Sequence, residues 1–452
     1  DIACLSQVLE QHAGTVAAVL LEPVQGEAGA IVPPAGYLRA VRDLCDQYKV
    51  LLILDEIQTG FWRTGPRFAA EAEQVVPDIM MLAKALGGGL VPIGACVMKS
   101  SVYSEDFGMK HSSTFGGNGL CARIACATLA EFERQQAFLQ QNVNDRAQQL
   151  YAAHLSLQQR FPRVVRGIAG RGLLQGVHLA LDREQVSQRR GNTLCVLSEQ
   201  EKLIPVVCSY LLNVHGIRLA PALNKGHVLR VEPPLTVTEA ECGAYIAALT
   251  RAVELLDAGN TAALCAHFVG SSETKVQQVG TATPAVEVQD VSLRTDESSL
   301  QKIAFLLHPI DYKSFIDFDQ SLAPFDRRQL QALSQLLATN IEPFVYGADR
   351  ITAKNGASVC CEFISLSHTA ESLMEMGPGA AVLEVAKAVD LARARGARLV
   401  GLGGFTSVVT QGGRKVLNRG VAITSGNSFT VVSAIDAVQM ACCQLGKSLA
   451  DS

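Results

Sequence analysis

Two short apolar runs, each followed at once by polar residues, constrain the fold of this chain more than any other feature. Val50–Leu54 is wholly apolar and ends on Asp55-Glu56, and Ile79–Leu82 ends two residues before Lys84. Short runs without alternation are typical of strands buried on both faces of a parallel sheet. Polar side chains directly after such strands lie at the carboxyl edge of the sheet, where open α/β folds bind ligands. The sequence therefore predicts an α/β fold with a site around Asp55 and Lys84.

The rest of the first half extends the same pattern. Thr15–Leu21 is another apolar run typical of a buried strand, and Pro34–Tyr48 has the apolar spacing of a helix that opens with proline. We assign residues 1–160 to a large α/β domain. Residues 161–257 have shorter, mixed elements and are predicted to form a smaller α+β domain.

The second half has a different character. Residues 258–299 lose the periodicity and are rich in Gly, Thr, Ser, Val and Gln, so we interpret them as a linker. Residues 300–452 regain a globular pattern and are predicted to form a separate α/β domain. The chain begins without methionine, and we expect it to be a fragment of a longer polypeptide.

Composition excludes several classes of protein. The formal net charge of -4 and the pI near 6.2 give no reason to expect nucleic acid or an anionic membrane as a partner. No apolar run is long enough for a membrane span. The 13 cysteines include no Cys-x-x-Cys pair, so we expect no metal site, and we interpret them as reduced thiols of a cytoplasmic protein.

Lys84 lies among small residues, between Ala83 and Ala85 and just before Gly87–Gly89. A buried ammonium is costly without a partner, so a structural role is hard to justify and a chemical one is favoured. Pyridoxal phosphate (PLP) needs such a lysine to hold it as a Schiff base, and a carboxylate such as Asp55 to keep its ring nitrogen protonated.

Five ordered segments carry a family resemblance over most of the first half. The chain resembles the class III aminotransferases, which include the ornithine, GABA, acetylornithine and, most similar, putrescine aminotransferases. The resemblance implies a fold type I aminotransferase with a partial large domain and a small C-terminal domain, working as a homodimer with PLP. The segments are Glu22–Gly29 (EPVQGEAG), Asp55–Gly60 (DEIQTG), Ala83–Gly89 (AKALGGG), His111–Asn118 (HSSTFGGN) and Leu229–Leu235 (LRVEPPL).

The resemblance also implies a cofactor role for each matching residue. Lys84 would bind PLP covalently and transfer protons, and Asp55 would pair with the pyridinium nitrogen. Gln58 would bond the phenolic oxygen, and Ile57, expected to face the same way as Asp55 along an extended chain, would pack under the ring. Thr114 would donate to the phosphate that the other subunit binds.

Two residues are implied in substrate binding. Arg230 would bind the carboxylate of the amino-acid partner, and Glu27 would cover Arg230 when an amine or aldehyde occupies the site. From the residues alone other interpretations stay open. Asp55 could cap the following segment, Gln58 and Thr114 could be turn residues, and Arg230 could lie on a strand surface.

The chain departs from the family at Trp62, where a small residue is usual, so this ring could fill part of the substrate channel or pack at an interface. The family also has a comparable length of chain before Glu22, which supplies a phosphate cradle and an aromatic ring stacked on PLP. We therefore expect this chain alone to bind PLP poorly.

The stretch from residue 300 contains ARLVGLGGFTSVVTQGG at Ala397–Gly413. Position 406 is threonine where a dinucleotide-binding motif needs glycine, so that motif fails here. Gly401–Ser407 and Thr424–Ser428 nevertheless resemble the N-terminal region of long-chain acyl-thioester (acyl-carrier-protein) reductases. A reductase of that kind would release an aldehyde that an aminotransferase could convert to an amine.

We therefore expect transamination of an aldehyde or ketone acceptor, with an amino acid or amine as donor. An NAD(P)H-dependent thioester reductase with an accessory aminotransferase-like part is an alternative, as is a PLP aminomutase or racemase that uses the same lysine chemistry. A non-catalytic remnant is disfavoured, because Asp55, Gln58, Lys84, Thr114 and Arg230 are all retained.

Overall fold

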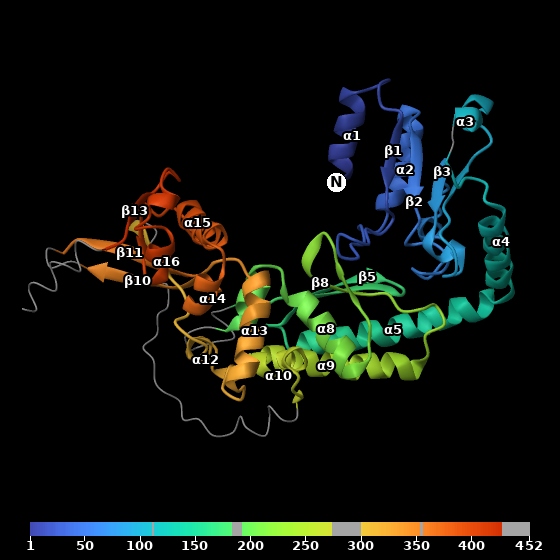
Figure 1. The fold of residues 1–452 in the computed structure, drawn as a ribbon. Helices are drawn as coiled ribbons and strands as arrows, with labels where there is room; N and C mark the ends of the chain where they lie inside the picture. Colours follow the sequence, from blue (N-terminus) through green and yellow to red (C-terminus); the bar gives the residue numbers. More distant parts are fainter. Residues whose placement is uncertain (111–112, 183–191, 274–299, 353–355, 427–452) are drawn as a thin grey trace, which may run out of the picture. The chain divides into compact units, whose positions relative to one another are not determined.

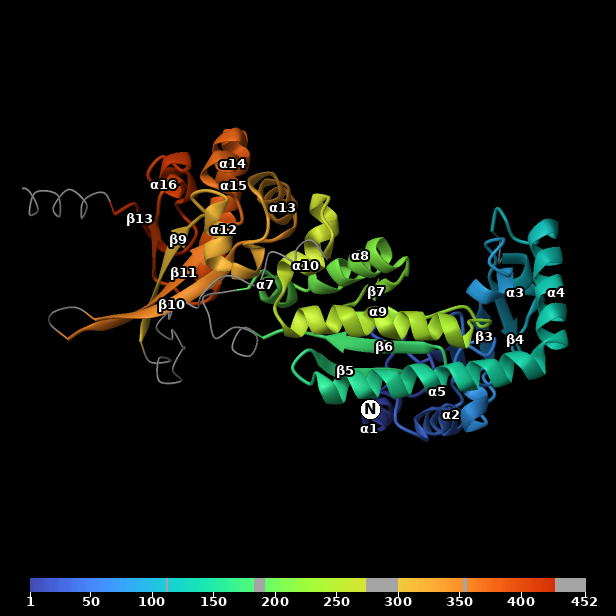
Figure 2. The same cartoon turned by 90° about the horizontal axis from the view of Figure 1, so that it is seen from below.

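The computed structural model describes residues 1–110, 113–182, 192–273, 300–352 and 356–426 (Figures 1 and 2). The chain divides into two compact units: among the described residues, unit 1 contains two sheets and unit 2 contains one. Unit 1 comprises residues 1–180 and 203–257, and unit 2 comprises the described residues of 181–202 and 258–452.

The first sheet of unit 1 is the one that the apolar runs predict. Its order is β1-β2-β3-β4, with β1, β2 and β3 parallel and β4 antiparallel at the end. The carboxyl ends of β2 and β3 therefore lie side by side at one edge. The strands are β1 (Ala18–Leu21), β2 (Leu51–Asp55), β3 (Ile79–Leu82) and β4 (Ala95–Met98).

Helices α1 (Ile2–Gln11) and α2 (Tyr37–Tyr48) pack against this sheet and bury its apolar side chains. The helical spacing predicted for Pro34–Tyr48 is confirmed, because Leu38, Val41 and Cys45 all face the core. Further along the chain come the 3-10 helix η1 (Ala69–Glu73), the 3-10 helix η2 (Lys84–Gly87), α3 (Glu105–Lys110) and α4 (Gly119–Arg134).

Asp78 links α2 to this sheet through hydrogen bonds. Its carboxylate accepts hydrogen bonds from Arg42 Nη1 at 2.7 Å, Lys99 Nζ at 2.8 Å and the Leu52 backbone amide at 2.8 Å. Burial alone would raise the pKa of Asp78, but the bonds from Leu52, Lys99 and Arg42 outweigh it and lower the pKa to about 2.

We expect this carboxylate to make unit 1 sensitive to acid. Because the pKa of Asp78 is lower in the folded state than its ordinary 3.8, its stabilising effect is present above that pH and is lost as the pH falls towards about 2. Asp78→Asn should cost about 2 kcal/mol near neutral pH, and the difference from the native protein should shrink in acid. Urea unfolding at a series of pH values measures this. The control is Asp46→Asn, which removes the exposed partner of Arg42; an equal loss there would contradict the assignment.

The second sheet of unit 1 is antiparallel, in the order β5-β6-β8-β7. Figure 2 shows the two long helices α5 and α9 running along it. The elements are α5 (Gln136–Arg160), β5 (Val165–Arg171), β6 (Leu174–Leu179), α8 (Leu203–His215), β7 (Ala220–Ala222), β8 (Lys225–Val231) and α9 (Glu239–Asp257).

A buried polar network ties these helices to the second sheet. His154 Nδ1 lies 2.9 Å from Gln175 Oε1, and His154 Nε2 lies 2.9 Å from the Tyr245 hydroxyl. Because the Gln175 amide nitrogen donates to the Gly172 carbonyl, its oxygen accepts from the imidazole. Burial lowers the pKa of His154 to about 4, against the effect of its bond to Gln175, so the ring is neutral at physiological pH.

Unit 2 is an α/β structure around a five-stranded sheet in the order β10-β11-β9-β12-β13. β11, β9, β12 and β13 are parallel, and β10 is antiparallel to β11 at the edge. The strands are β9 (Gln301–Leu307), β10 (Phe344–Thr352), β11 (Ser358–Ser365), β12 (Leu399–Leu402) and β13 (Ala422–Thr424). The helices are α7 (Thr193–Glu199), α10 (Thr261–Cys265), α12 (Lys313–Phe318), α13 (Arg327–Asn340), α14 (Ala370–Glu375), α15 (Pro378–Ala394) and α16 (Phe405–Val409).

Two segments differ from the boundaries that the sequence suggested. Residues 258–273 of the expected 258–299 linker include the wholly buried helix α10, whose Thr261 hydroxyl donates to Asp319; residues 274–299 lie outside the described part. Residues 192–202 belong with unit 2 rather than with the expected 161–257 domain, because α7 is buried there and the Thr193 amide donates to Asp319 at 2.9 Å.

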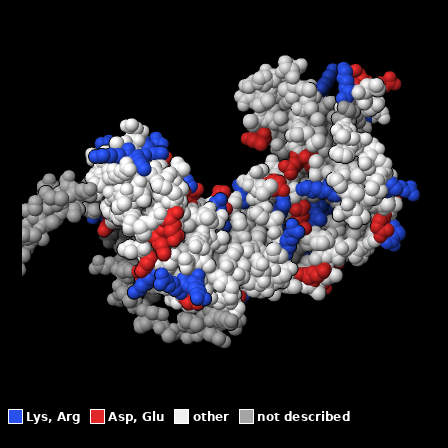
Figure 3. Space-filling model, viewed as in Figure 1, with Lys and Arg blue, Asp and Glu red and all other residues white. Residues whose placement is uncertain are grey.

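On the face drawn in Figure 3, basic and acidic side chains are interspersed. Within the described ranges, no helix is both long enough and apolar enough to cross a membrane.

Candidate active site

Asp55 and Lys84 lie at the carboxyl edge of the first sheet, where the sequence predicted them. Asp55 is the last residue of β2, and Lys84 opens η2 two residues after β3. Asp55 is in register with Met81 of β3, and the next amide, that of Glu56, donates to the Met81 carbonyl at 3.1 Å. Two adjacent parallel strands therefore deliver a carboxylate and a primary amine to one edge.

The backbone at Lys84 is strained. Its φ of 44° lies in the left-handed region, which costs a residue with a Cβ roughly 1–2 kcal/mol. Gly88 and Gly89 have positive φ as well, and a Cβ on Gly88 would lie 2.6 Å from the Thr128 hydroxyl oxygen of α4. Strain of this kind at an exposed lysine is typical of sites where the backbone aims a side chain for function.

Asp55 is held by a local turn. Its Oδ1 accepts the Ile57 amide hydrogen at 3.0 Å, and residues 57–60 form a turn. The extended conformation predicted for Asp55–Ile57, with both side chains on one side, is therefore wrong, because the Asp55 side chain binds the backbone amide two residues on. The packing of Ile57 under a cofactor ring stays a prediction.

Gln58 is buried and bound by a residue that the sequence analysis did not identify. Its Nε2 donates to both carboxylate oxygens of Glu232, at 3.0 and 3.1 Å. The Gln58 side chain lies over Gly26, where a Cβ would come within 2.2 Å of Gln58 Oε1. In the sequence, the one local indication that Glu232 belongs to this site is its position two residues after Arg230.

Arg230 of β8 lies between two carboxylates. It forms an ion pair with Glu27, as predicted, and its Nε lies 3.4 Å from Glu232 Oε2. Burial alone would raise the pKa of Glu27, but Arg230, the Leu223 amide and the charge of Lys84 together lower it. Glu27 is therefore ionised at neutral pH, and the charge of Lys84 favours this form as well.

The loop after Gln58 is anchored to the second sheet of unit 1. Arg63 Nη1 donates to the carbonyls of Leu173 at 3.1 Å and Pro233 at 2.5 Å, and the Leu173 amide donates back to the Arg63 carbonyl at 2.8 Å. Burial lowers the pKa of Arg63, and the charge of Glu232 opposes that change. The same segment that carries Gln58 is thus bonded to the segment that carries Glu232.

Trp62, whose role the sequence left open, packs inside unit 1. Its ring is buried, lies 5.8 Å from the Phe132 ring of α4, and has the Arg67 guanidinium 5.3 Å above it. It has a left-handed φ of 64°, as does its neighbour Phe61 at 56°. This ring stabilises the loop between Gln58 and Arg63.

Thr114 is exposed in a turn that precedes Asn118, the N-cap of α4. Within the described part of this chain it makes no hydrogen bond to Asp55, Gln58 or Lys84, and its role across a subunit interface stays a prediction. His111 lies outside the described residues. No group of three or more His, Cys, Asp or Glu in the described ranges could hold a metal ion.

The fold and this site define a lysine–carboxylate centre at the edge of a parallel sheet. The family model for class-III aminotransferases matches residues 2–253, more than half of the chain, and the chain therefore belongs to the class-III aminotransferase family.

Solved structures of aminotransferases also resemble the chain. An acetylornithine aminotransferase from Elizabethkingia anophelis is 30% identical (56% of this chain, 61% of that chain, TM-score 0.47). The ornithine aminotransferase from Toxoplasma gondii, described with partial occupancy of PLP, is 33% identical (57% and 55%, TM-score 0.46). A transaminase from the marine bacterium Virgibacillus is 25% identical (57% and 57%, TM-score 0.48). The chain thus spans between 55% and 61% of the length of these proteins.

Class III aminotransferases use PLP, and the residues of this chain fit one side of that cofactor. Asp55 offers a carboxylate anchored through only one oxygen among the described residues, Lys84 offers an exposed amine, and Gln58 offers an amide. The Gln58 side chain can take this position because residue 26 has no Cβ.

Proposed function

We propose that this chain takes part in PLP-dependent transamination, in which an amino acid or amine donates its amino group to an aldehyde or ketone. The observation that carries the proposal is the placement of Asp55 and Lys84 on adjacent strand ends, with the Glu27–Arg230 ion pair in the same unit. The family membership supports the same reaction class.

The bound cofactor would supply an electron sink for the substrate's α-carbon. Lys84 would hold the cofactor and move the proton at that carbon, because its amine is the base delivered to this edge. Asp55 would pair with the pyridine nitrogen through its carboxylate and keep that nitrogen protonated. Gln58 would direct its amide to the phenolic oxygen, with Glu232 fixing the orientation of that amide.

Arg230 would distinguish substrates with a carboxylate from those without one. Its guanidinium is already paired with Glu27 and Glu232, so a substrate carboxylate has to displace Glu27 before it can bind. An amine or aldehyde without a carboxylate leaves the ion pair closed, which avoids exposing an unpaired charge in a half-buried site.

The half-reaction of the full-length protein tests this proposal. L-glutamate and butylamine should each convert the cofactor to its amine form, and the absorbance of the cofactor measures this conversion. Arg230→Ala should lower kcat/KM for L-glutamate roughly 10–100-fold, because the variant loses a charge-assisted hydrogen bond to the substrate carboxylate. It should change kcat/KM for butylamine far less, because butylamine has no carboxylate. Arg218→Ala, at an exposed arginine, is the matched control. The proposal would be contradicted if no donor converted the cofactor, or if Arg230→Ala lowered kcat/KM equally for both donors. The half-reaction also distinguishes an aminotransferase from an aminomutase or racemase.

We also propose a homodimer, in which Thr114 reaches the partner's cofactor phosphate. The support is local: Phe115 and Leu120, on either side of the Asn118 cap, expose 79% and 68% of their surface. Large apolar side chains exposed together are typical of interaction surfaces.

The reductase-like interpretation of residues 300–452 stays a prediction. The strand–turn–helix at β12, Gly403–Gly404 and α16 is compatible with it, but part of its second motif, Thr424–Ser428, lies outside the described residues. Consumption of NADPH by the full-length protein with an acyl thioester would support it. A cytoplasmic location is likewise a prediction.

A further inference from the structure

Unit 2 contains a cavity at the carboxyl edge of its sheet. The parallel strands β9 and β11 end at Leu307 and Ser365, and both ends border a cavity of about 350 Å³. Its walls come from α7, α12, α13 and the first residues of β10, all within unit 2. This is the edge at which α/β proteins bind small molecules, and the volume is in the range of small ligand sites.

The walls are mainly apolar and aromatic. The Phe318 ring lies 5.5 Å from that of Phe344 and 5.3 Å from that of Tyr346, so three rings form one side. Leu337 and Ile341, at the end of α13, form another side and expose only 6% of their surface each. An apolar molecule in this cavity would replace water next to these side chains, which favours its binding.

The polar groups of the cavity are mostly bonded to the protein itself. His308 Nδ1 donates to the Pro309 carbonyl and its Nε2 accepts the Phe405 amide hydrogen. The hydroxyls of Ser365 and Ser367 donate to backbone carbonyls. The Tyr346 hydroxyl makes no hydrogen bond within the described residues, and so it can bond one polar group of a ligand.

The charges of its lining residues make this cavity unsuitable for a nucleotide. Among its described lining residues there is no lysine or arginine, and Asp317 is the one charged side chain. A phosphate or carboxylate would lose its hydration without gaining a cation, so anionic ligands are disfavoured.

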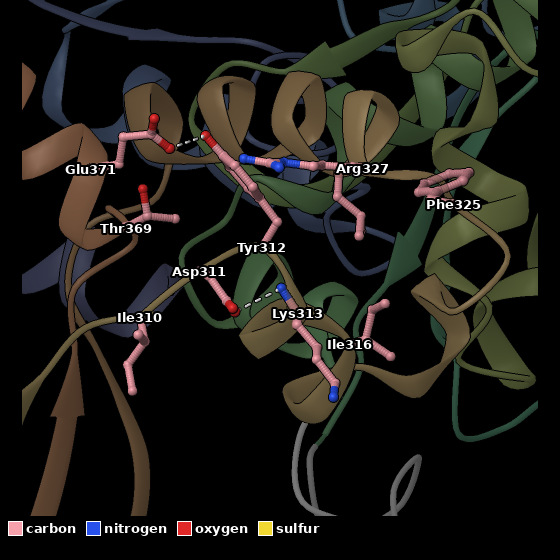
Figure 4. Close-up of a pocket in the computed structure, with 10 residues that line it drawn as sticks. Ile310, Asp311, Tyr312, Lys313, Ile316, Phe325, Arg327, Thr369 and Glu371 are labelled. Atoms are coloured by element: carbon pink, nitrogen blue, oxygen red, sulfur yellow. Dashed lines mark hydrogen bonds between the residues drawn. The ribbon is translucent and has the colours of Figure 1, made fainter.

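The neighbouring cavity differs in this respect. Figure 4 shows it, with the charged residues Lys313, Arg327 and Glu371 among those that line it. There the Tyr312 hydroxyl points to Glu371 and donates to it at 3.4 Å. Leu330 of α13 lines this neighbour, whereas Leu337, on the same helix, lines the apolar cavity.

We propose that the apolar cavity of unit 2 binds an uncharged, apolar small molecule with a single hydroxyl or carbonyl group, which bonds the Tyr346 hydroxyl. The proposal is independent of the aminotransferase chemistry of unit 1, since every residue that carries it lies in unit 2.

Equilibrium dialysis of the full chain with radiolabelled decanol tests the binding. Hexanol should bind at least roughly tenfold more weakly, because each methylene adds apolar burial, and decanoate should bind at least roughly tenfold more weakly than decanol because it carries a charge. Absence of decanol binding, equal binding of decanoate, or displacement of decanol by NADPH would overturn the proposal.

Matched substitutions locate the site. Leu337→Trp fills the cavity and should abolish decanol binding, whereas Leu330→Trp, on the same helix and equally buried, should leave it unchanged. Phe315→Ala enlarges the cavity and should shift the binding preference from decanol to tetradecanol. This second variant locates the site even if Leu337→Trp does not fold. Equal effects of the two tryptophan variants, or an unchanged chain-length preference in Phe315→Ala, would refute the assignment.

Discussion

Lys84→Ala in the full-length protein should reduce kcat/KM for the donor half-reaction by at least roughly a thousandfold, with any donor. The lysine supplies both the covalent attachment and the proton transfer, and general acid–base catalysis alone contributes roughly 10²–10⁴-fold. Borohydride reduction of the native protein with PLP, followed by peptide mass spectrometry, should place the cofactor on the peptide that contains Lys84 and on no peptide of the variant.

The variant should fold normally, because the Lys84 side chain is exposed and substitutions at such positions change stability little. Lys110→Ala, which removes an exposed lysine whose ion pair among the described residues is with Asp106, is the control and should keep full activity. A reduced cofactor on another lysine, or substantial turnover by the Lys84→Ala variant, would contradict the assignment of Lys84.

Glu56→Ala should be the most destabilising single substitution among the residues discussed, at about 3–5 kcal/mol. Glu56 is fully buried, and its carboxylate accepts the Thr59 hydroxyl and the amides of Ala69 and Ala70, at 3.0 and 2.9 Å. Removing it leaves these three donors buried without an acceptor. Burial raises the pKa of Glu56, and the three hydrogen bonds lower it only in part.

Urea unfolding followed by tryptophan fluorescence measures this effect. The chain has one tryptophan, Trp62, in the loop that Glu56 holds, so the signal reports on unit 1. Glu56→Gln, which keeps one acceptor oxygen, should lose roughly half as much. Glu71→Ala, at an exposed acid of η1, is the control, and a loss there as large as in Glu56→Ala would point to a general effect of charge.

The elements that position Asp55 and Lys84 could be predicted because their signal is local. Uninterrupted apolar runs identified β2 and β3, and the polar residues that follow them identified the edge. The Glu27–Arg230 pair was expected from the family resemblance, and the structure contains it.

The features that the sequence did not predict depend mostly on contacts between residues far apart in the sequence. Glu232 binds Gln58 from 174 positions away, and no spacing or periodicity reports such a pair. Helix α10 was interpreted as linker because five small or apolar residues are too few for a helical period. Its burial in unit 2, the Asn260 cap and the bond from Thr261 to Asp319 stabilise it. The turn at Ile57 was missed because the Asp55 side chain, rather than a strand partner, holds that amide.

The close approach of Gln58 to Gly26 means that these two positions do not mutate independently. Any side chain at position 26 would occupy the space of the Gln58 amide, and so Gly26→Ala acts as a substitution of residue 58 as well. In a saturation library for altered donor preference, single changes at position 26 should be lost almost completely. Pairing them with a smaller residue at position 58 should recover folded protein, so the two sites form one unit of selection.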